Sequence, residues 1–471
     1  MVPAVTDGGG SARQAALDAI RRARQGPLFL RDALHAIFQE THLSARDRAL
    51  ATQLAAGVLR HRRTLRLLVG HARGQGRRAG TIQPALLGVL ELGVFQLLFL
   101  DRVPAYAAVN ESVEAARRAA RSPGAARKTA GFVNGVLRAV ERLIVGREPA
   151  GTPAADALPH PEGGVVRLAA PLLPDPATDR AAFLGAAYSY PDWLVARWAA
   201  HFGPEQAEEI CRWGNRRPAT CARINPMGAG ADDLLNRLQE ETPGVAPGPQ
   251  PGTLDVSALP ADRLERLCAE GRLAVQDPSS MIAVEMLAPK AGEAVLDLCA
   301  SPGTKTTQIV EAMGDRGRVV ACDRSEEKIG ALRRVLAERR IESVTVCLSE
   351  EAAGAGPPGG FDAALVDAPC SNTGVLARRV EARWRLRAPD LEELAALQAA
   401  LLQRAAAMVR PGGRLLYATC SLEPEENDGQ VRAFLAERPD WTAEARRQAF
   451  PAADHDGSFA ALLVRAARPA G

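Results

Sequence analysis

The chain has 471 residues, of which 47% are hydrophobic and 24% are charged, a balance that excludes general disorder and predicts packed domains. The formal net charge is only +3, but residues 1–147 hold 23 Lys and Arg against 10 Asp and Glu, which gives 23 − 10 = +13 there and 3 − 13 = −10 in the remainder. This asymmetry predicts either a polyanion that binds the first 147 residues or an arginine-rich helical surface that faces solvent.

The N-terminal segment 1–10 lacks the basic and apolar stretches of a signal peptide. The most apolar window, 85–100, is shorter than the roughly 20 residues that a bilayer requires. It also contains Glu91 and Gln96, so we expect a buried core helix rather than a membrane span. The 8 cysteines include no CxxC pair, which favours free thiols in a reducing cytoplasm over a disulfide framework.

The first part of the chain has helical periodicity. Leu50, Leu54 and Val58 recur at four-residue spacing with arginines on either side, which predicts an amphipathic helix with a charged outer face. The window 85–100 is apolar on nearly every side, so we expect this helix at the centre of a bundle. An all-helical domain is therefore predicted for residues 1–147.

The next part of the chain is more irregular. Residues 148–184 are rich in Pro, Gly and Ala, which predicts a linker or a loosely packed connection. Helical patterning returns around Trp193 and Trp198, and residues 220–275 mix short apolar runs with Pro/Gly turns. We predict a small α/β subdomain over residues 185–290.

From Glu293 onward, strands alternate with helices. The predicted strands are 294–298, 319–322, 344–347, 363–366 and 415–418. One predicted helix begins near Thr304, and two more span 326–339 and 391–409. This alternation predicts, for residues 291–471, a Rossmann-like α/β domain whose doubly wound, mostly parallel sheet binds ligands at the carboxyl ends of its strands.

A glycine turn follows the first of these strands. The run 297–306, DLCASPGTKT, places Gly303 where the backbone could approach a ligand, just before the free N–H groups of a helix start. Asp323, at the end of the second strand, is placed to accept hydrogen bonds from ribose hydroxyls. The spacing fits neither a Walker A loop nor GxGxxG. On spacing alone, the run is either a nucleotide-like cofactor site, with S-adenosylmethionine as one candidate, or a structural turn.

Two cysteines follow the fourth and fifth strands. Cys370 lies in Asp-Ala-Pro-Cys-Ser and Cys420 in Ala-Thr-Cys-Ser, and both turns should open onto the ligand edge. A thiolate that adds to C6 of a cytosine makes C5 able to attack a methyl sulfonium, provided that an acid stabilises the adduct and a base removes the C5 proton. The spacing does not rank the two thiols. Packing in strands or turns is the preferred interpretation for Cys299, Cys322 and Cys347.

With these motifs, the chain resembles the Sun family of RNA cytosine-C5 methyltransferases, in its bacterial RsmB (Fmu) type, which acts on small-subunit ribosomal RNA. The matching segments of the catalytic part are 297–306, Asp323, 367–371 with Thr373-Gly374, and 417–421 followed by Pro424-Glu-Glu-Asn427. The helical part, through 102–111 and 131–138, is similar to the NusB-like RNA-binding domain of that type.

The resemblance implies roles for individual residues. Cys420 would be the nucleophile, Cys370 would assist release of the product, and Asp367 would contact the N3 edge of the cytosine. It also implies S-adenosyl-L-methionine as the cofactor, with Asp323 at its ribose and Lys305 on the family's motif lysine. The positions implied to line the cofactor are Cys299, Ala300, Ser301, Pro302, Gly303, Lys305, Asp323, Ser349, Glu350 and Asp367.

Two positions depart from the family pattern. Thr304 stands where the family usually has a second glycine. After the third strand the family usually has an aspartate that faces the adenine, whereas this chain reads Cys-Leu-Ser-Glu, so that Ser349 or Glu350 substitutes for it or the contact is lost.

An arginine-rich segment follows the first cysteine motif. Its residues Arg378, Arg379, Arg383, Trp384 and Arg385 are predicted either to hold RNA phosphates and stack a base or to form a solvated charged loop. The expected partner is small-subunit (16S) ribosomal RNA, and we expect a monomer without a metal and without membrane contact.

Two competing hypotheses remain from the sequence. The chain could be a non-catalytic RNA-binding or assembly protein with a vestigial cofactor fold, although Cys370, Cys420, Asp323 and Asp367 are all present. Alternatively, the enzyme could act on transfer RNA or on another RNA, a choice on which only the N-terminal domain bears.

Overall fold

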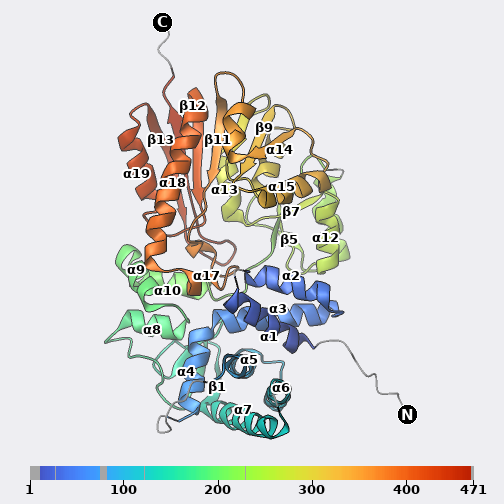
Figure 1. The fold of residues 1–471 in the computed structure, drawn as a ribbon, viewed down its shortest axis with the longest axis vertical. Coiled ribbons are helices and arrows are strands. Elements are labelled where there is room, and N and C mark those ends of the chain that lie inside the picture. The colour runs from blue at the N-terminus through green and yellow to red at the C-terminus, as the bar shows by residue number, and fades with distance from the viewer. Residues whose placement is uncertain (1–10, 27, 75–81, 121, 229, 468–471) are drawn as a thin grey trace, which may run out of the picture. The chain divides into compact units, whose positions relative to one another are not determined.

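The computed structural model describes residues 11–26, 28–74, 82–120, 122–228 and 230–467 (Figure 1). The segment 1–10, for which the sequence predicts no signal peptide, lies outside this range. The chain divides into two compact units, residues 1–217 with 376–385 and residues 218–375 with 386–471. No helix among the described residues is long and apolar enough to cross a membrane.

The first unit begins with helices: α1 Ala12–Gln25, α2 Leu30–Glu40, α3 Ala45–Arg60, α4 Arg62–Ala72, α5 Pro84–Phe99, α6 Ala105–Arg118 and α7 Pro123–Leu143. As predicted, α5 is central and packs against α1, α3, α4, α6 and α7 (Figure 1). Its one acidic residue, Glu91, is fully buried and pairs with Arg24 and Arg66 at 2.6 Å each. Two arginines therefore offset the charge that the apolar helix buries.

A small antiparallel sheet follows the helices. It contains β1 Ile144–Glu148, β2 Ala157–Pro159 and β3 Val165–Leu168 in the order β1-β3-β2. Leu158 and Val165 are fully buried, so the prediction of a loosely packed connection is wrong for this stretch. The apolar residues are spread thinly among Pro and Gly, and only their pairing across strands builds an apolar face. Helices α8 Arg180–Ala187, α9 Asp192–Phe202 and α10 Pro204–Trp213 complete the run up to the unit's boundary.

The second unit opens with a four-stranded antiparallel sheet in the order β5-β6-β4-β7. Its elements are β4 Cys221–Ile224, η1 Ala231–Asp233, α11 Leu234–Glu241, β5 Ala246–Pro247, β6 Thr253–Asp255, α12 Ala261–Ala269 and β7 Leu273–Val275. They enclose a core that includes Leu238, Leu254 and Leu267. The small subdomain predicted over 185–290 is thus divided, because residues up to Arg217 cluster with the first unit.

The large sheet of the second unit has the strand order β10-β9-β8-β11-β12-β14-β13. Its elements are α13 Pro278–Leu287, β8 Ala294–Asp297, α14 Thr304–Ala312, β9 Arg318–Asp323, α15 Glu326–Glu338, β10 Val344–Leu348, η2 Ser349–Glu351, α16 Ala352–Ala355, β11 Phe361–Asp367, η3 Thr373–Val375, α18 Ala388–Met408, β12 Val409–Thr419, α19 Asp428–Glu437, β13 Trp441–Ala449 and β14 Ser458–Arg465. Strands β8 to β12 run parallel, and β14 is antiparallel to both β12 and β13. The predicted Rossmann-like, mostly parallel architecture is confirmed.

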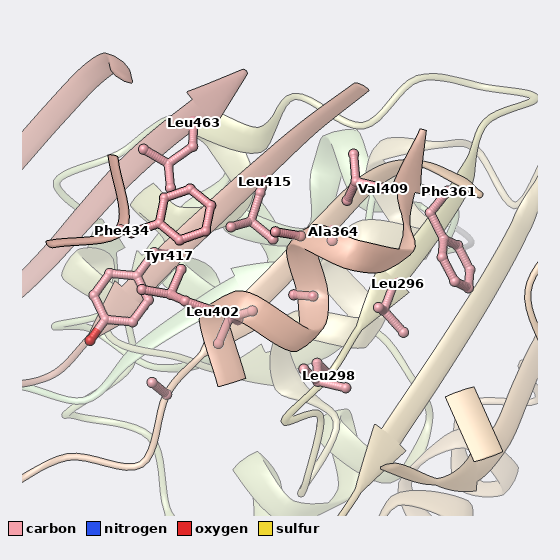
Figure 2. Packing of buried hydrophobic residues seen from close by; sticks show 14 of the residues in the cluster. Leu296, Leu298, Phe361, Ala364, Leu402, Val409, Leu415, Tyr417, Phe434 and Leu463 are labelled. Atoms are coloured by element: carbon pink, nitrogen blue, oxygen red, sulfur yellow. The ribbon is translucent and has the colours of Figure 1, made fainter. Parts of the chain in front are cut away.

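Side chains of the parallel strands alternate between two helical layers. Val319 packs with residues of α13 and α14, whereas Val320 and Cys322 pack on the opposite side with residues of α18 and α19. Figure 2 shows Leu402 of α18 among the apolar side chains of this second layer, including Leu415. A sheet covered on both faces leaves the ends of its strands as the place for a polar site.

The strand order reverses at β8, which lies between β9 and β11. The register aligns the carboxyl ends of neighbouring strands: Asp323 is opposite Leu348, and Asp367 is opposite Ala418. The loops that carry the predicted cofactor and cysteine motifs therefore leave the sheet at one edge, at the reversal point where open α/β sheets bind ligands.

Candidate active site

The two predicted cysteines meet at this edge. Sγ of Cys370 lies 3.2 Å from Sγ of Cys420, although 50 residues separate them in the chain. The register explains the contact, because Asp367 and Ala418 are opposite one another and each chain then turns within three residues into its cysteine. Both thiols are free; Cys370 is buried and Cys420 is half-buried. The sulfurs therefore converge as the hypothesis of thiol chemistry requires.

Asn372 links the two cysteine loops. Its Oδ1 accepts a hydrogen bond from the Cys420 thiol at 3.3 Å, and its Nδ2 donates to the carbonyl oxygen of Cys370 at 2.7 Å. The residue has a φ of +62°, a left-handed conformation that asparagine tolerates better than most residues. The hydrogen bond with Cys420, followed by burial, raises the pKa of the Cys370 thiol well above its usual range. Cys370 is therefore held in its neutral form.

The loop after β8 bends sharply around Gly303. This glycine has a φ of +112°, and a Cβ there would lie 2.8 Å from Cδ1 of Leu332. Only glycine fits at this position, and α14 begins immediately after it with its free N–H groups. Ala300 is buried and donates its N–H to the carbonyl of Cys322, which fixes the loop against β9.

Asp323 ends β9 beside this loop. Its carboxylate accepts the N–H of Ser301 at 3.1 Å and the N–H of Arg324 at 2.7 Å, and it pairs with Lys328 at 3.0 Å. The side chain is 96% buried, so these partners compensate for the loss of water around the charge. The acid and the glycine loop, predicted from spacing alone, therefore lie next to each other.

Lys305 and Asp367 form an ion pair at 2.6 Å across the same edge. Burial would lower the pKa of Lys305, but the charge and hydrogen bond of Asp367 outweigh burial and raise the pKa overall. One step deeper, Asp297 accepts a hydrogen bond from Thr306 at 2.8 Å, and burial raises the pKa of this carboxyl to about 7. The edge therefore combines a fixed ammonium group, a paired carboxylate and an acid that titrates near neutrality.

The two departures from the family pattern fit the loop geometry. Thr304 is the first residue of α14 and is not among the non-glycine residues with positive φ, so a second glycine is not needed there. Ser349 is buried and donates to the carbonyl of Leu298 at 3.4 Å, whereas Glu350 is exposed. Of the two candidate substitutes, Ser349 is the one whose side chain lies against the β8 end.

The arginine-rich segment belongs to the first unit, and one of its predictions is corrected. Arg383 is fully buried, with its guanidinium 3.9 Å from the centre of the Tyr190 ring. It donates to Asn215 Oδ1 at 2.7 Å and to the carbonyl of Gly214 at 2.8 Å. A guanidinium without exposed surface is not open to an RNA phosphate, so the predicted RNA contact of Arg383 is wrong, and the residue instead ties its segment to the helices.

The neighbours of Arg383 also contact the helical unit but keep some exposed surface. Trp384 donates its ring N–H to the carbonyl of Leu59 at 2.7 Å, and Arg385 donates to the carbonyl of Ala23 at 2.8 Å. Arg378 and Arg379 are exposed. RNA contact stays a prediction for these four residues.

Sequence reasoning missed the acid beneath the cysteine loops. Glu426 is fully buried and accepts hydrogen bonds from Ser371, Ser421 and Gln398. Its segment, 424–427, is part of the matched family pattern, yet no role for Glu426 follows from that pattern. The available signal was three glutamates shortly after a cysteine motif, at 423, 425 and 426, and nothing in that signal distinguishes a buried acid from an exposed one.

The described residues contain no group of three or more His, Cys, Asp or Glu side chains that could hold a metal ion. What they do provide is a pair of thiols, one of them kept protonated, beside an ammonium–carboxylate pair and a glycine turn. Such a set can form and break a bond between sulfur and carbon while a neighbouring group gives or takes a proton.

Three family models match the chain. The model for 16S rRNA methyltransferase RsmB/F matches residues 284–461 and so covers the large sheet and both cysteine loops. The NusB family model matches residues 10–142, the helical part of the first unit. A third model, for an RsmF/B-like ferredoxin-like domain, matches residues 190–252, which span the boundary between the two units.

Curated relatives are similar along nearly the whole chain. A Synechocystis protein named probable ribosomal RNA small subunit methyltransferase B is 33% identical over 441 residues, 92% of this chain and 91% of the relative. A Bacillus subtilis protein of the same name is 31% identical over 440 residues, 92% of this chain and 89% of the relative.

Solved structures share the fold. The crystal structure titled PH0851 has a TM-score of 0.75 and 24% identity, and the match covers 96% of this chain and 98% of that one. A methyltransferase homolog from Pyrococcus horikoshii has a TM-score of 0.54 and 24% identity, and the match covers 62% of this chain and 100% of that one.

Proposed function

The chain belongs to the RsmB/F family of 16S ribosomal RNA methyltransferases, and from this premise we propose that it methylates C5 of a cytosine in small-subunit ribosomal RNA through a covalent cysteine adduct. The observation that carries the proposal is the 3.2 Å approach of the Cys370 and Cys420 sulfurs at the carboxyl edge of the sheet.

Cys420 is the nucleophile in this proposal. Its thiolate adds to C6 of the cytosine, so that a bond between sulfur and C6 forms and C5 gains the electron density to attack a methyl group. The family assigns this role to Cys420, and its greater accessibility supports the assignment, because Cys420 is half-buried and Cys370 is buried. Asp367 would contact N3 and pass to it a proton from the Lys305 ammonium, which lies 2.6 Å from the carboxylate, so that the adduct is neutralised.

Release of the product breaks the bond between the cysteine and the cytosine. After methylation a base removes the proton from C5, the electron pair returns to the ring, and the bond between C6 and Sγ of Cys420 breaks. Cys370, 3.2 Å away, is the group that assists this step by exchanging a proton with the departing sulfur.

S-adenosyl-L-methionine supplies the methyl group as a sulfonium cation. The residues at the edge fit such a ligand, because the carboxylate of Asp323 lies at the end of β9 beside the loop after β8, where it can accept hydrogen bonds from ribose hydroxyls. Asp323 would bind the ribose, and the backbone of residues 299–303 would line the methionine part. Ser349 would lie on the adenine side.

The RNA partner is proposed from charge and family. Residues 1–147 hold the positive excess, and Arg127 and Lys128 are exposed on α7. Phosphate contacts from such residues would make affinity salt-dependent, with a slope that falls by about 0.7 to 0.9 for each contact that is lost. The double variant Arg127→Gln, Lys128→Gln tests this part by measuring RNA affinity across salt concentrations; an unchanged slope would exclude both residues from the interface.

The reaction itself is tested with the purified full-length chain. It is incubated with labelled S-adenosyl-L-methionine and small-subunit ribosomal RNA, and the RNA is then digested and its nucleosides are separated by mass spectrometry. The proposal expects label in 5-methylcytidine. Label in another nucleoside, or label that appears with transfer RNA and not with ribosomal RNA, would contradict it, and RNA binding without any methyl transfer would favour the non-catalytic alternative.

A further inference from the structure

Glu426 is a fully buried acid that the proposed reaction does not use. Its Oε1 accepts hydrogen bonds from the backbone N–H of Ser371 and from the side-chain amide of Gln398, both at 2.9 Å. Its Oε2 accepts hydrogen bonds from the hydroxyls of Ser371 and Ser421, both at 2.5 Å. Four donors therefore converge on one carboxylate, as they do where a buried charge has to be stabilised by hydrogen bonds alone.

The two serines give this carboxylate its position between the loops. Ser371 directly follows Cys370, and Ser421 directly follows Cys420, so the same group holds the residue next to each reactive sulfur. The two hydroxyls are themselves 3.0 Å apart. Gln398 extends the connection to α18, because its amide also donates to the carbonyl of Pro369 at 2.8 Å.

We propose that Glu426 is a positioning residue that sets the distance between the Cys370 and Cys420 sulfurs by binding Ser371 and Ser421 at the same time. The importance of that distance rests on the proposed function, but the distance itself can be tested without RNA or cofactor. An error of about 1 Å in the placement of reacting groups can cost on the order of a hundredfold in rate. A single acid shared by both loops is a direct way to prevent such an error.

The test measures how readily the two thiols combine. The full-length protein is equilibrated with mixtures of reduced and oxidised glutathione; two protein thiols and one oxidised glutathione give one protein disulfide and two reduced glutathiones. The Cys370–Cys420 disulfide is quantified by mass spectrometry of unreduced peptides. Its equilibrium constant reports how often the sulfurs meet, because a pair held together forms a disulfide more readily than a pair on independent loops.

Three variants separate geometry from folding. Glu426→Ala removes all four acceptor contacts and is expected to lower the equilibrium constant at least tenfold. Glu426→Gln keeps one carbonyl oxygen for the Ser371 N–H and Gln398 and can donate to the two hydroxyls, so it should stay within threefold of the wild type. The double variant Ser371→Ala, Ser421→Ala, which changes little in volume, should lose at least threefold.

Cys322 serves as the internal folding control. Its side chain is fully buried on β9, outside the Glu426 contacts, and it should stay protected from alkylation in every variant that folds. In methyl transfer, Glu426→Ala should reduce kcat at least tenfold and leave KM for S-adenosyl-L-methionine unchanged, and Glu426→Gln should restore most of kcat.

Three outcomes would overturn the positioning role. The first is a thiol equilibrium that is unchanged in Glu426→Ala. The second is an equal loss in Glu426→Gln and Glu426→Ala, which would assign the effect to charge rather than to spacing. The third is a loss of protection at Cys322 in the serine double variant as well, which would make the contacts a general requirement of folding. If the thiol results hold but the wild type methylates no cytosine, the proposed function fails and the positioning role stands.

Discussion

The large sheet carries two thiol pairs whose spacing is nearly the same and whose surroundings differ. Cys370 and Cys420 lie 3.2 Å apart on loops beyond the strand ends, whereas Cys322 and Cys347 lie 3.3 Å apart on the paired strands β9 and β10. The first pair contacts Asn372 and adjoins two serines that bind Glu426. The second belongs to the apolar core. Each pair has one buried and one half-buried cysteine, so neither proximity nor exposure defines the site; its polar partners and its place on loops beyond the strand ends do.

The largest effect should follow from removing the sulfur of Cys420. We expect Cys420→Ala to lose methyl transfer by about 10³-fold or more, because the nucleophile that opens the reaction is gone. Binding of S-adenosyl-L-methionine should stay within twofold, as measured by calorimetry. Cys347→Ser, which changes the matched sulfur of the second pair, should keep activity within twofold, and equal losses in the two variants would erase the distinction between the pairs.

The next effect should be a block after methylation in Cys370→Ala. Without the neighbouring thiol the bond between Cys420 and the cytosine should break slowly, so that turnover falls by about a hundredfold and a covalent protein–RNA adduct accumulates. A slow-migrating band on a denaturing gel reports the adduct. Cys322→Ala should give no such band; its absence from Cys370→Ala too would reject the release role.

The sequence predicted the first pair and did not predict the second. Cys370 and Cys420 follow strands whose order and parallel direction could be inferred from periodicity, so their meeting at one edge followed from topology. Cys322 and Cys347 were correctly assigned to packing, but their contact depends on the register between β9 and β10, in which they are opposite each other. A short apolar run fixes the presence of a strand better than its register.

Long-range burial explains the other differences from expectation. Arg383 was predicted to contact RNA or to lie in a solvated loop because it follows the first cysteine motif among other arginines, yet Asn215 and Tyr190, far away in the sequence, enclose it. The motif shows that an acid stands at Glu426, but it does not show which four groups donate hydrogen bonds to that acid. In both cases the function of the side chain depends on residues brought together only by the fold.

The alkylation rates of Cys420 and Cys322, one thiol from each pair, should differ by a smaller factor. At pH 8 we expect iodoacetamide to modify Cys420 roughly fiftyfold faster than Cys322. Burial raises the pKa of the Cys322 thiol, which lowers its thiolate fraction, and burial also keeps the reagent from reaching the sulfur. Mass spectrometry of peptides after timed quenching gives both rates from one sample. Raising the pH to 9 should leave Cys322 unmodified; rapid modification there would show that Cys322 is as accessible as Cys420.

The smallest effect should come from Asp297, whose charge contributes to the raised pKa of Cys322 and whose own pKa is raised to about 7 by burial. A carboxyl has a pKa of about 3.9 when unfolded. Between these values the folded state holds a proton that the unfolded state has released, so the free energy of unfolding must fall as the pH rises from about 4 to about 7. Asp297→Asn removes this titration while keeping an oxygen that can accept from Thr306. The free energy of unfolding of Asp297→Asn minus that of the wild type should therefore increase by about 2 kcal/mol from pH 5 to pH 8, as measured by urea titrations at each pH. Parallel pH profiles for the two proteins would mean that Asp297 is already ionised in the folded state.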